Sequence, residues 1–178
     1  MIRKVRLEDA AAIANIYKYY VENTAITFEL VVPTCEEMES RIQKIVKKYP
    51  YLVYEFEGKV IGYAYAGLFK EREAYRFSTE LSIYFDHELC GKGFGREITV
   101  ALLAELASYD YSTVVVCITL PNERSQKLFE SIGFEYAGVL KNVGYKFDKW
   151  LSIIYYTLPI KEYTRNTNSE KVKFIERL

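Results

Sequence analysis

The chain has 178 residues, a length that most simply predicts one domain with a full hydrophobic core. Lys plus Arg and Asp plus Glu are equal at 24 each, so no net charge would draw the protein to nucleic acid or to an anionic membrane. We expect neither a membrane span nor a signal peptide, because no apolar run is long enough, and three cysteines without a framework spacing favour a reduced, cytoplasmic setting.

The first half of the chain predicts a strand, two helices and a hairpin. Thr34 and Glu37 have the spacing of a capping box, and Glu57-Gly58-Lys59 is typical of a tight turn between strands. The predicted elements are a strand at 2–6, a helix capped by Asp9, a helix after Thr34, and strands at 51–56 and 60–69.

The second half predicts a long strand, two strand–helix units and a closing pair of strands. The predicted elements are a strand at about 75–85, a helix at 94–108, a strand at 113–119, a helix opened by Asn122 and ended by Gly133, and strands at 134–143 and 145–158. This order predicts an α/β (α+β) fold, a mixed sheet with helices on both faces. We expect one domain over residues 1–160 and a polar tail over 161–178, in which Val172, Ile175 and Leu178 can line a short docking helix.

A glycine loop is the most informative stretch. Gly91, Gly93 and Gly95 follow a strand and open a helix, an arrangement in which backbone N–H groups and the helix dipole face a phosphate. A P-loop would need Lys and Ser or Thr after the glycine, but Phe94 follows Gly93. A dinucleotide fingerprint belongs after the first strand, and this loop comes much later. A purely structural turn is the remaining alternative.

The stretch from Cys90 to Gly95, which contains these glycines, resembles the acetyl-CoA loop of the GNAT N-acetyltransferases. The segment from Asn122 to Ser125 is similar to the next motif of that family. Further stretches resemble the branch that acetylates phosphinothricin and methionine sulfoximine: Thr27-Phe28-Glu29, Gly62 to Ala66, Arg72 to Tyr75, Glu80 to Tyr84, and Val143 to Phe147 with Trp150.

The resemblance implies a mostly antiparallel sheet in which one parallel pair of strands splays apart to admit the pantetheine arm of acetyl-CoA. It implies transfer of acetyl to the primary amine of a small, amino-acid-like acceptor, with no metal, and a homodimer. The implied acetyl-CoA-binding residues are Ile83, Tyr84, Phe85, Gly91, Lys92, Gly93, Phe94, Gly95, Arg96, Asn122 and Ser125. Arg124 or Lys127 can add charge near the adenosine end.

Glu80 is the candidate general base, which must take a proton from the attacking amine. In an alternating strand it shares a face with Ser82 and Tyr84, and we expect it at the end of the strand nearest the pyrophosphate. Burial of this acid would raise its pKa toward that of a working base. The alternative is a structural carboxylate paired with an arginine.

The acceptor residues depend more heavily on the resemblance. Arg72 can clamp an acceptor carboxylate or phosphinate, although a solvated charge is the plain alternative. Tyr75 lies beside it in the sequence. Phe28, with Tyr63 or Tyr65, can wall the acceptor pocket or simply pack in the core.

The sequence also departs from the family at three places. Cys90 stands where Arg or Gln is usual, and it is either a reactive thiol or a small tolerated residue. Phe129 replaces a residue that can protonate the leaving thiolate, which leaves Ser125, Tyr145 or water for that role. Ser152 stands where relatives often carry Asp. Alternative functions therefore remain, namely acetylation of a polyamine, an aminoglycoside or a protein N-terminus, or CoA binding without catalysis.

Overall fold

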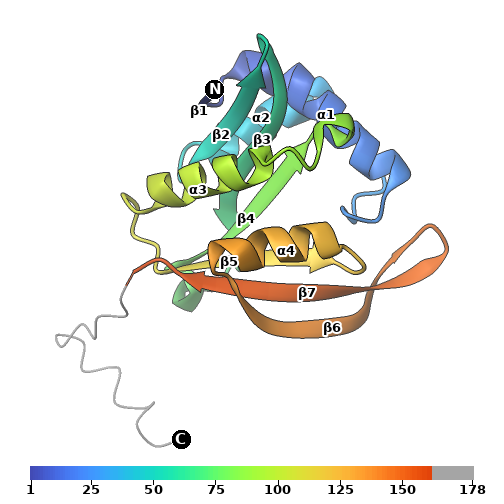
Figure 1. Ribbon diagram of the computed structural model, residues 1–178, viewed down its shortest axis with the longest axis vertical. Helices are drawn as coiled ribbons and strands as arrows, with labels where there is room; N and C mark the ends of the chain where they lie inside the picture. Colours follow the sequence, from blue (N-terminus) through green and yellow to red (C-terminus); the bar gives the residue numbers. More distant parts are fainter. Residues whose placement is uncertain (162–178) are drawn as a thin grey trace, which may run out of the picture.

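The computed structural model describes residues 1–161, and the rest of the predicted tail, with Val172, Ile175 and Leu178, lies outside them. The described chain forms one seven-stranded sheet with helices on both faces (Figure 1). The strands are β1 (Ile2–Lys4), β2 (Tyr51–Phe56), β3 (Lys59–Leu68), β4 (Ser78–Phe85), β5 (Thr113–Thr119), β6 (Glu135–Lys146) and β7 (Lys149–Pro159). The α-helices are α1 (Ala10–Asn23), α2 (Cys35–Ile45), α3 (Phe94–Leu106) and α4 (Glu123–Ile132).

The sheet has the order β1-β2-β3-β4-β5-β7-β6. Every neighbouring pair is antiparallel except β4 and β5, which are parallel. The predicted mixed sheet with helices on both faces is therefore confirmed, including the chain order of its elements.

Two hydrophobic clusters fill the two sides of the sheet. One lies under α3 and α4 and includes Leu81, Phe85 and Phe129, while the other lies under α1 and α2 and includes Tyr17 and Tyr63. Because side chains alternate along a strand, the odd-numbered residues of β4 face α3 and the even-numbered residues face the side of α1. Glu80 thus points to the side of the sheet that carries α1 and α2.

The parallel pair separates partway along its length. β4 and β5 are paired only at Ser78–Thr113, Thr79–Val114 and Glu80–Val115, and after that β4 turns toward α1 while β5 continues beside β7 (Figure 1). The second half of β4 consequently has a free backbone edge facing β5. This divergence is the feature that the resemblance implied.

Two predicted boundaries were wrong. The strand expected from Tyr75 begins only at Ser78, because Glu73–Tyr75 form a 3₁₀ turn in which the Tyr75 N–H donates to the Arg72 carbonyl (2.9 Å). The closing strands turn at Phe147 and Asp148, both left-handed with φ of 51° and 57°, rather than near Gly144. Gly144 reads as a turn residue in the sequence but lies inside β6.

The helix starts differ in how they are capped. The capping box of Thr34 and Glu37 is present, with Glu37 N–H donating to the Thr34 hydroxyl (3.2 Å) and Thr34 N–H donating to the Glu37 carboxylate (2.8 Å). Asp9 does not cap α1 with its side chain. Its carboxylate instead accepts two bonds from the Arg3 guanidinium, both 2.8 Å, and one from the Arg6 N–H, 2.7 Å.

Asp9 joins β1 to α1 by a buried ion pair, since its side chain is only 5% exposed. Burial by itself would raise the pKa of Asp9, but the bonds from Arg3 and Arg6 outweigh it and leave the pKa below its ordinary value. A lowered pKa means that the carboxylate stabilises the fold at neutral pH, and that this stabilisation is lost as the pH falls through the folded-state pKa.

Replacing Asp9 with Asn should therefore lower the free energy of unfolding by about 2–3 kcal/mol at pH 7, because it leaves Arg3 with one buried partner fewer. The difference from the wild type should shrink below about pH 4, as measured by urea unfolding across pH. Glu8→Gln is the matched control, since Glu8 makes an exposed pair with Arg6 and should change stability by less than about 0.5 kcal/mol. A loss at pH 7 that persisted unchanged at pH 3 would contradict this account.

Candidate functional site

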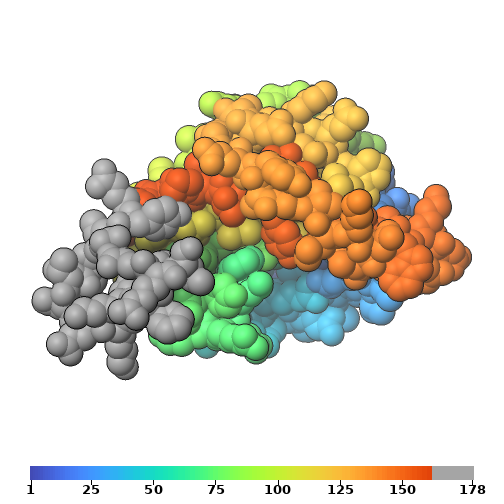
Figure 2. Space-filling view, turned by 90° about the horizontal axis from the view of Figure 1, so that it is seen from below, coloured from blue at the N-terminus to red at the C-terminus, as the bar shows by residue number. Residues whose placement is uncertain are grey.

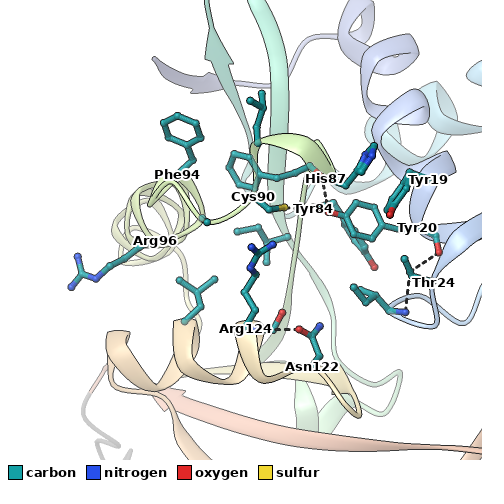
Figure 3. A pocket seen from close by; sticks show the side chains of 18 of the residues that line it. Tyr19, Tyr20, Thr24, Tyr84, His87, Cys90, Phe94, Arg96, Asn122 and Arg124 are labelled. Carbon is teal, nitrogen blue, oxygen red and sulfur yellow. Dashed lines mark hydrogen bonds between the residues drawn. The ribbon is translucent and has the colours of Figure 1, made fainter.

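A cavity of about 430 Å³ opens where β4 has left β5, between the glycine loop and the first turn of α4. Most of the predicted cofactor-binding residues line it, and Figure 3 shows their side chains around one hollow. The predicted lining residues are Ile83, Tyr84, Phe85, Gly91, Gly93, Phe94, Gly95, Arg96, Asn122 and Ser125. Lys92 is exposed and does not line the cavity.

The glycine loop has the geometry of an anion cradle. Gly91 and Gly93 have φ of +89° and +91°, which L side chains rarely adopt, so both positions require glycine. The first α3 bonds that reach back to the loop run from the N–H groups of Arg96 and Glu97 to the Gly93 carbonyl, which leaves the earlier N–H groups of the helix pointing outward.

Positive charge is brought to this cradle by α4. A Cβ added to Gly91 would lie 3.1 Å from Nη2 of Arg124, which places the guanidinium against the loop (Figure 3). Lys127, the other predicted cation, pairs instead with Glu123 on the exposed face of α4 (3.7 Å) and does not line the cavity. A pyrophosphate between Arg124 and the N-terminus of α3 would therefore find both N–H donors and a cation.

Asn122 and Ser125 form the wall opposite the loop. The Asn122 side-chain oxygen Oδ1 accepts the Ser125 N–H (3.2 Å), so the side chain caps α4 and is held facing the cavity. The Leu120–Pro121 peptide just before them is cis.

Glu80 does not line this cavity, and its expected place at the pyrophosphate end of β4 was wrong. It lies near the start of β4 and is the last residue that pairs with β5, at the vertex from which the two strands diverge. Burial raises the pKa of Glu80 above its ordinary value. Among residues 1–161 it makes no ion pair, so the alternative of an arginine-paired structural carboxylate finds no support there.

Two groups beside Glu80 were missed by the sequence argument. Cys117 follows Val115 on the same face of β5 and is paired with Tyr155 of β7, so thiol, phenol and carboxyl share one face at the vertex. Burial, with a contribution from the Glu80 charge, raises the pKa of Cys117 to about 11, and burial with the Cys117 and Glu80 charges raises that of Tyr155 to about 12. Neither residue stands in a recognisable motif, and only the strand register brings them to Glu80.

Aromatic residues at the end of α1 also line the cavity. Tyr20 donates its hydroxyl to the Phe85 carbonyl (2.6 Å) and lies 3.7 Å from the Cys90 sulfur, and all three residues line the cavity (Figure 3). Cys90 is partly buried and donates to the Asp86 carbonyl (3.4 Å). His87 is stacked on Tyr19 at 3.6 Å between ring centroids, and both residues line the cavity.

The predicted acceptor residues do not line this cavity. Arg72 and Tyr75 belong to the link between β3 and β4, at the end of β4 that carries Glu80. Arg72 is exposed, and it forms no ion pair within residues 1–161. Tyr75 packs edge-on against Phe69 at 5.6 Å.

Of the aromatic candidates, Tyr63 is a core residue at 2% exposure, whereas Phe28 is 38% exposed. Tyr65 is paired with Ser82 across β3 and β4, next to Glu80.

Phe129 is buried and packs against Phe134 at 5.1 Å, which agrees with its having no part in proton transfer. Tyr145 is exposed and its hydroxyl donates to Asp148 (3.4 Å) on the hairpin, while the Ser152 hydroxyl accepts from the Asn142 N–H (3.1 Å).

Within residues 1–161 there is no group of His, Cys, Asp and Glu side chains that could hold a metal ion. No helix in the same range is long and apolar enough to cross a bilayer.

A sheet that splays beside a glycine loop, with a charged cradle at a helix N-terminus, defines an acyl-CoA-type transferase fold. Residues 2–154 match the acetyltransferase (GNAT) domain family, so the chain belongs to that family. It is 37% identical to a phosphinothricin N-acetyltransferase of Alcaligenes faecalis, over 89% of this chain and 82% of that protein. It is 31% identical to an L-methionine sulfoximine/L-methionine sulfone acetyltransferase of Salmonella typhimurium, over 91% of this chain and 95% of that protein.

A solved structure agrees with these relatives. A GNAT phosphinothricin acetyltransferase from Sinorhizobium meliloti, determined in complex with AcCoA, superposes with a TM-score of 0.90 at 34% identity, covering 97% of this chain and 95% of that one. The family and the fold expected from the glycine loop are therefore confirmed.

The environment of Glu80 has a consequence for stability. A carboxyl whose folded-state pKa is raised costs the fold free energy wherever it is ionised, and this cost vanishes once the pH falls below the unfolded-state pKa of about 4.3. Glu80→Gln should therefore unfold at a higher temperature than the wild type at pH 8 and at the same temperature at pH 4, as calorimetry would measure. Glu135→Gln, on an exposed position of β6, is the control that should show no such pH-dependent gain. Equal or lower stability of Glu80→Gln at pH 8 would mean that the ionised carboxylate is stabilised by its surroundings.

Proposed function

We propose that this chain transfers acetyl from acetyl-CoA to the primary amine of a small, amino-acid-like acceptor of the phosphinothricin and methionine sulfoximine type, with Glu80 as general base. The observation that carries the proposal is the position of Glu80 at the vertex of the diverging strands. An arm of acetyl-CoA that entered from the glycine loop and ran along the free edge of β4 would bring its thioester toward this carboxyl.

The residues of the cavity suit successive parts of acetyl-CoA, from the pyrophosphate to the pantetheine arm. Arg124 and the left-handed Gly91 and Gly93 suit the pyrophosphate, while Asn122 and the free edge of β4 beyond Glu80 suit the amides of pantetheine. The AcCoA complex of the similar S. meliloti enzyme supports the same ligand for this chain.

The reaction needs a neutral amine nitrogen to attack the thioester carbonyl carbon. As the N–C bond forms and the C–S bond breaks, the sulfur takes the bonding electrons and Glu80 takes the proton from the amine. Burial suits Glu80 to this role because it raises the pKa of the carboxyl toward working pH. We assign to Ser125, which lines the cavity, the role of proton donor to the departing thiolate in place of Phe129.

On the acceptor side, we assign the carboxylate or phosphinate of the acceptor to Arg72 and the apolar wall to Phe28 and Tyr75. Arg72 is suited to this because it is exposed at the end of β4 that carries Glu80, and a guanidinium binds such groups through two parallel hydrogen bonds. An anionic acceptor also agrees with the names of the similar enzymes.

The decisive experiment compares CoA release from acetyl-CoA with phosphinothricin, methionine sulfoximine, methionine sulfone, common amino acids and spermidine. Glu80→Gln should lower kcat/KM for the best acceptor at least about tenfold and leave acetyl-CoA affinity unchanged, and it should lack the fall in rate that the wild type shows as Glu80 is protonated toward acid pH. Glu135→Gln is again the control. Unchanged turnover in Glu80→Gln would reject the base, and tight acetyl-CoA binding without CoA release on any amine would indicate a binding module instead.

Arg72→Ala should raise the acceptor KM about tenfold or more, since it removes a charge-assisted contact, and should leave the acetyl-CoA KM unchanged. Arg76→Ala is the matched comparison and should have a smaller effect, because Arg76 is already held by Glu73 (3.7 Å) and by the ring of Phe77 (4.4 Å). An Arg72→Ala enzyme with an unaltered acceptor KM, or one that preferred spermidine, would assign the anionic end of the acceptor elsewhere.

We further propose that the enzyme works in the cytoplasm as a homodimer. The outer part of the β6–β7 hairpin supports a contact with a second copy, because Trp150, Tyr145, Phe147 and Val143 are between 50% and 66% exposed there.

A further inference from the structure

The segment from Thr24 to Glu29, which follows α1, is fastened to its surroundings at several points. The Tyr17 hydroxyl lies 2.6 Å from the Thr27 hydroxyl, and the Thr119 hydroxyl donates to the Ile26 carbonyl (3.4 Å). Arg41 of α2 donates to both carboxylate oxygens of Glu29, at 2.7 and 3.0 Å. This segment carries Ile26, which lines the cofactor cavity, and Phe28 two residues later.

The far end of the β6–β7 hairpin reaches the same segment. Nζ of Lys146 donates to the Thr27 carbonyl (2.9 Å), a contact between residues 119 apart in the sequence. Figure 2 shows the orange-to-red hairpin lying against the blue N-terminal part of the chain. The hairpin is thus joined to the segment that carries both Ile26, at the cavity, and Phe28.

Lys146 is an unusual residue to use for this contact. It is only 4% exposed, and burial lowers the pKa of its amine. Its ammonium has three donors, and within residues 1–161 it has no carboxylate at ion-pair distance. Nζ also lies 5.1 Å from the centroid of the Phe147 ring, and the charge of Glu29 favours the ammonium. Because burial of a cation is costly, the hydrogen bond to the Thr27 carbonyl is needed to stabilise Lys146 in this place.

Gly144 makes the second contact from the hairpin. A Cβ at this position would lie 2.2, 2.4 and 2.8 Å from three ring atoms of Phe28, far inside van der Waals contact. The φ of Gly144 is not in the left-handed region, so its backbone would accept alanine. The glycine is therefore required by the close approach of the Phe28 ring and not by the backbone conformation.

We propose that Lys146 and Gly144 are specificity-determining positioning residues, which together fix where Phe28 stands and so set the size of acceptor that the enzyme accepts. Lys146 holds the backbone at Thr27, and Gly144 leaves room for the ring of Phe28, the residue that follows Thr27. Two fixed points on adjacent residues leave the Phe28 side chain little freedom of direction. The inference rests on the proposed function in one respect, namely that Phe28 walls the acceptor pocket.

The first test replaces the ammonium with an apolar chain of similar length. Lys146→Met should raise the acceptor KM about tenfold and broaden the range of accepted side-chain sizes, while the acetyl-CoA KM stays within about twofold. Lys149→Met is the matched control, since Lys149 is the exposed strand partner of Lys146 on the same hairpin and should leave both constants unchanged. An unchanged acceptor profile in Lys146→Met would overturn the proposal.

The second test is a double-mutant cycle across the contact. Gly144→Ala alone should raise the acceptor KM about tenfold, because the methyl group displaces the Phe28 ring, whereas in a Phe28→Ala background the same change should cost less than about twofold. Equal effects of Gly144→Ala in both backgrounds would show that the glycine does not act through Phe28.

A readout independent of activity separates this inference from the proposed function. The N–H groups of Ile26 and Glu29 donate to the hydroxyls of Thr24 and Thr27, both at 3.2 Å, so hydrogen exchange at these amides reports whether the segment is held. Exchange there should become at least about tenfold faster in Lys146→Met and remain unchanged in Lys149→Met and in α3. If no acceptor of the panel is turned over by the wild type, the proposed function fails, and the exchange result still decides whether Lys146 holds the segment. Unchanged exchange in Lys146→Met would overturn the claim that Lys146 holds the segment from Thr24 to Glu29.

Discussion

The structure depends on the failure of two parallel strands to stay paired. β4 and β5 share hydrogen bonds only as far as Glu80 and Val115, and beyond that point each strand follows a different set of neighbours. β4 continues beside β3 toward α1, while β5 is held along its whole length by β7, from Thr113 to Thr119. A backbone edge inside a sheet must find other partners, and a ligand with amide groups can supply them. The divergence thus creates the cavity, and the Glu80 carboxyl stands at the vertex where the two strands separate.

Several tyrosines pack near this divergence, on the side of the sheet that carries α1. Where β4 leaves β5, the sheet needs large side chains to fill the space on the side of α1, and tyrosines supply rings whose polar ends find partners. Tyr17, Tyr20 and Tyr84 pack edge-on at 5.0 and 5.2 Å, and the hydroxyls of the first two reach Thr27 and the Phe85 carbonyl. Within residues 1–161 no buried side-chain nitrogen or oxygen lacks a partner, so this polar interior is fully satisfied.

Much of the fold was predictable because local patterns determine it. The capping box at Thr34, the buried strand at 113–119 and the glycine stop at Gly133 each act within a few residues, and all three were confirmed. The errors arose where tertiary contacts override such patterns. The break between the closing strands was expected at Gly144, but this glycine lies within β6, where the Phe28 ring approaches it closely. Asp9 was taken for a helix cap, but the guanidinium of Arg3 from the neighbouring strand competes successfully for its carboxylate.

The sequence alone determined the family, the cofactor loop and the identity of the acid in the central strand. These are encoded by residues close together in the chain, where a glycine permits a left-handed backbone and alternation fixes the face of a strand. The tertiary structure decided where that acid stands, at the vertex rather than at the pyrophosphate end, and which residues surround it. Cys117, Tyr155 and Lys146 reach their places through strand register and through a contact that spans 119 residues. Such contacts depend on how the whole sheet twists and packs, and no short stretch of sequence carries that information.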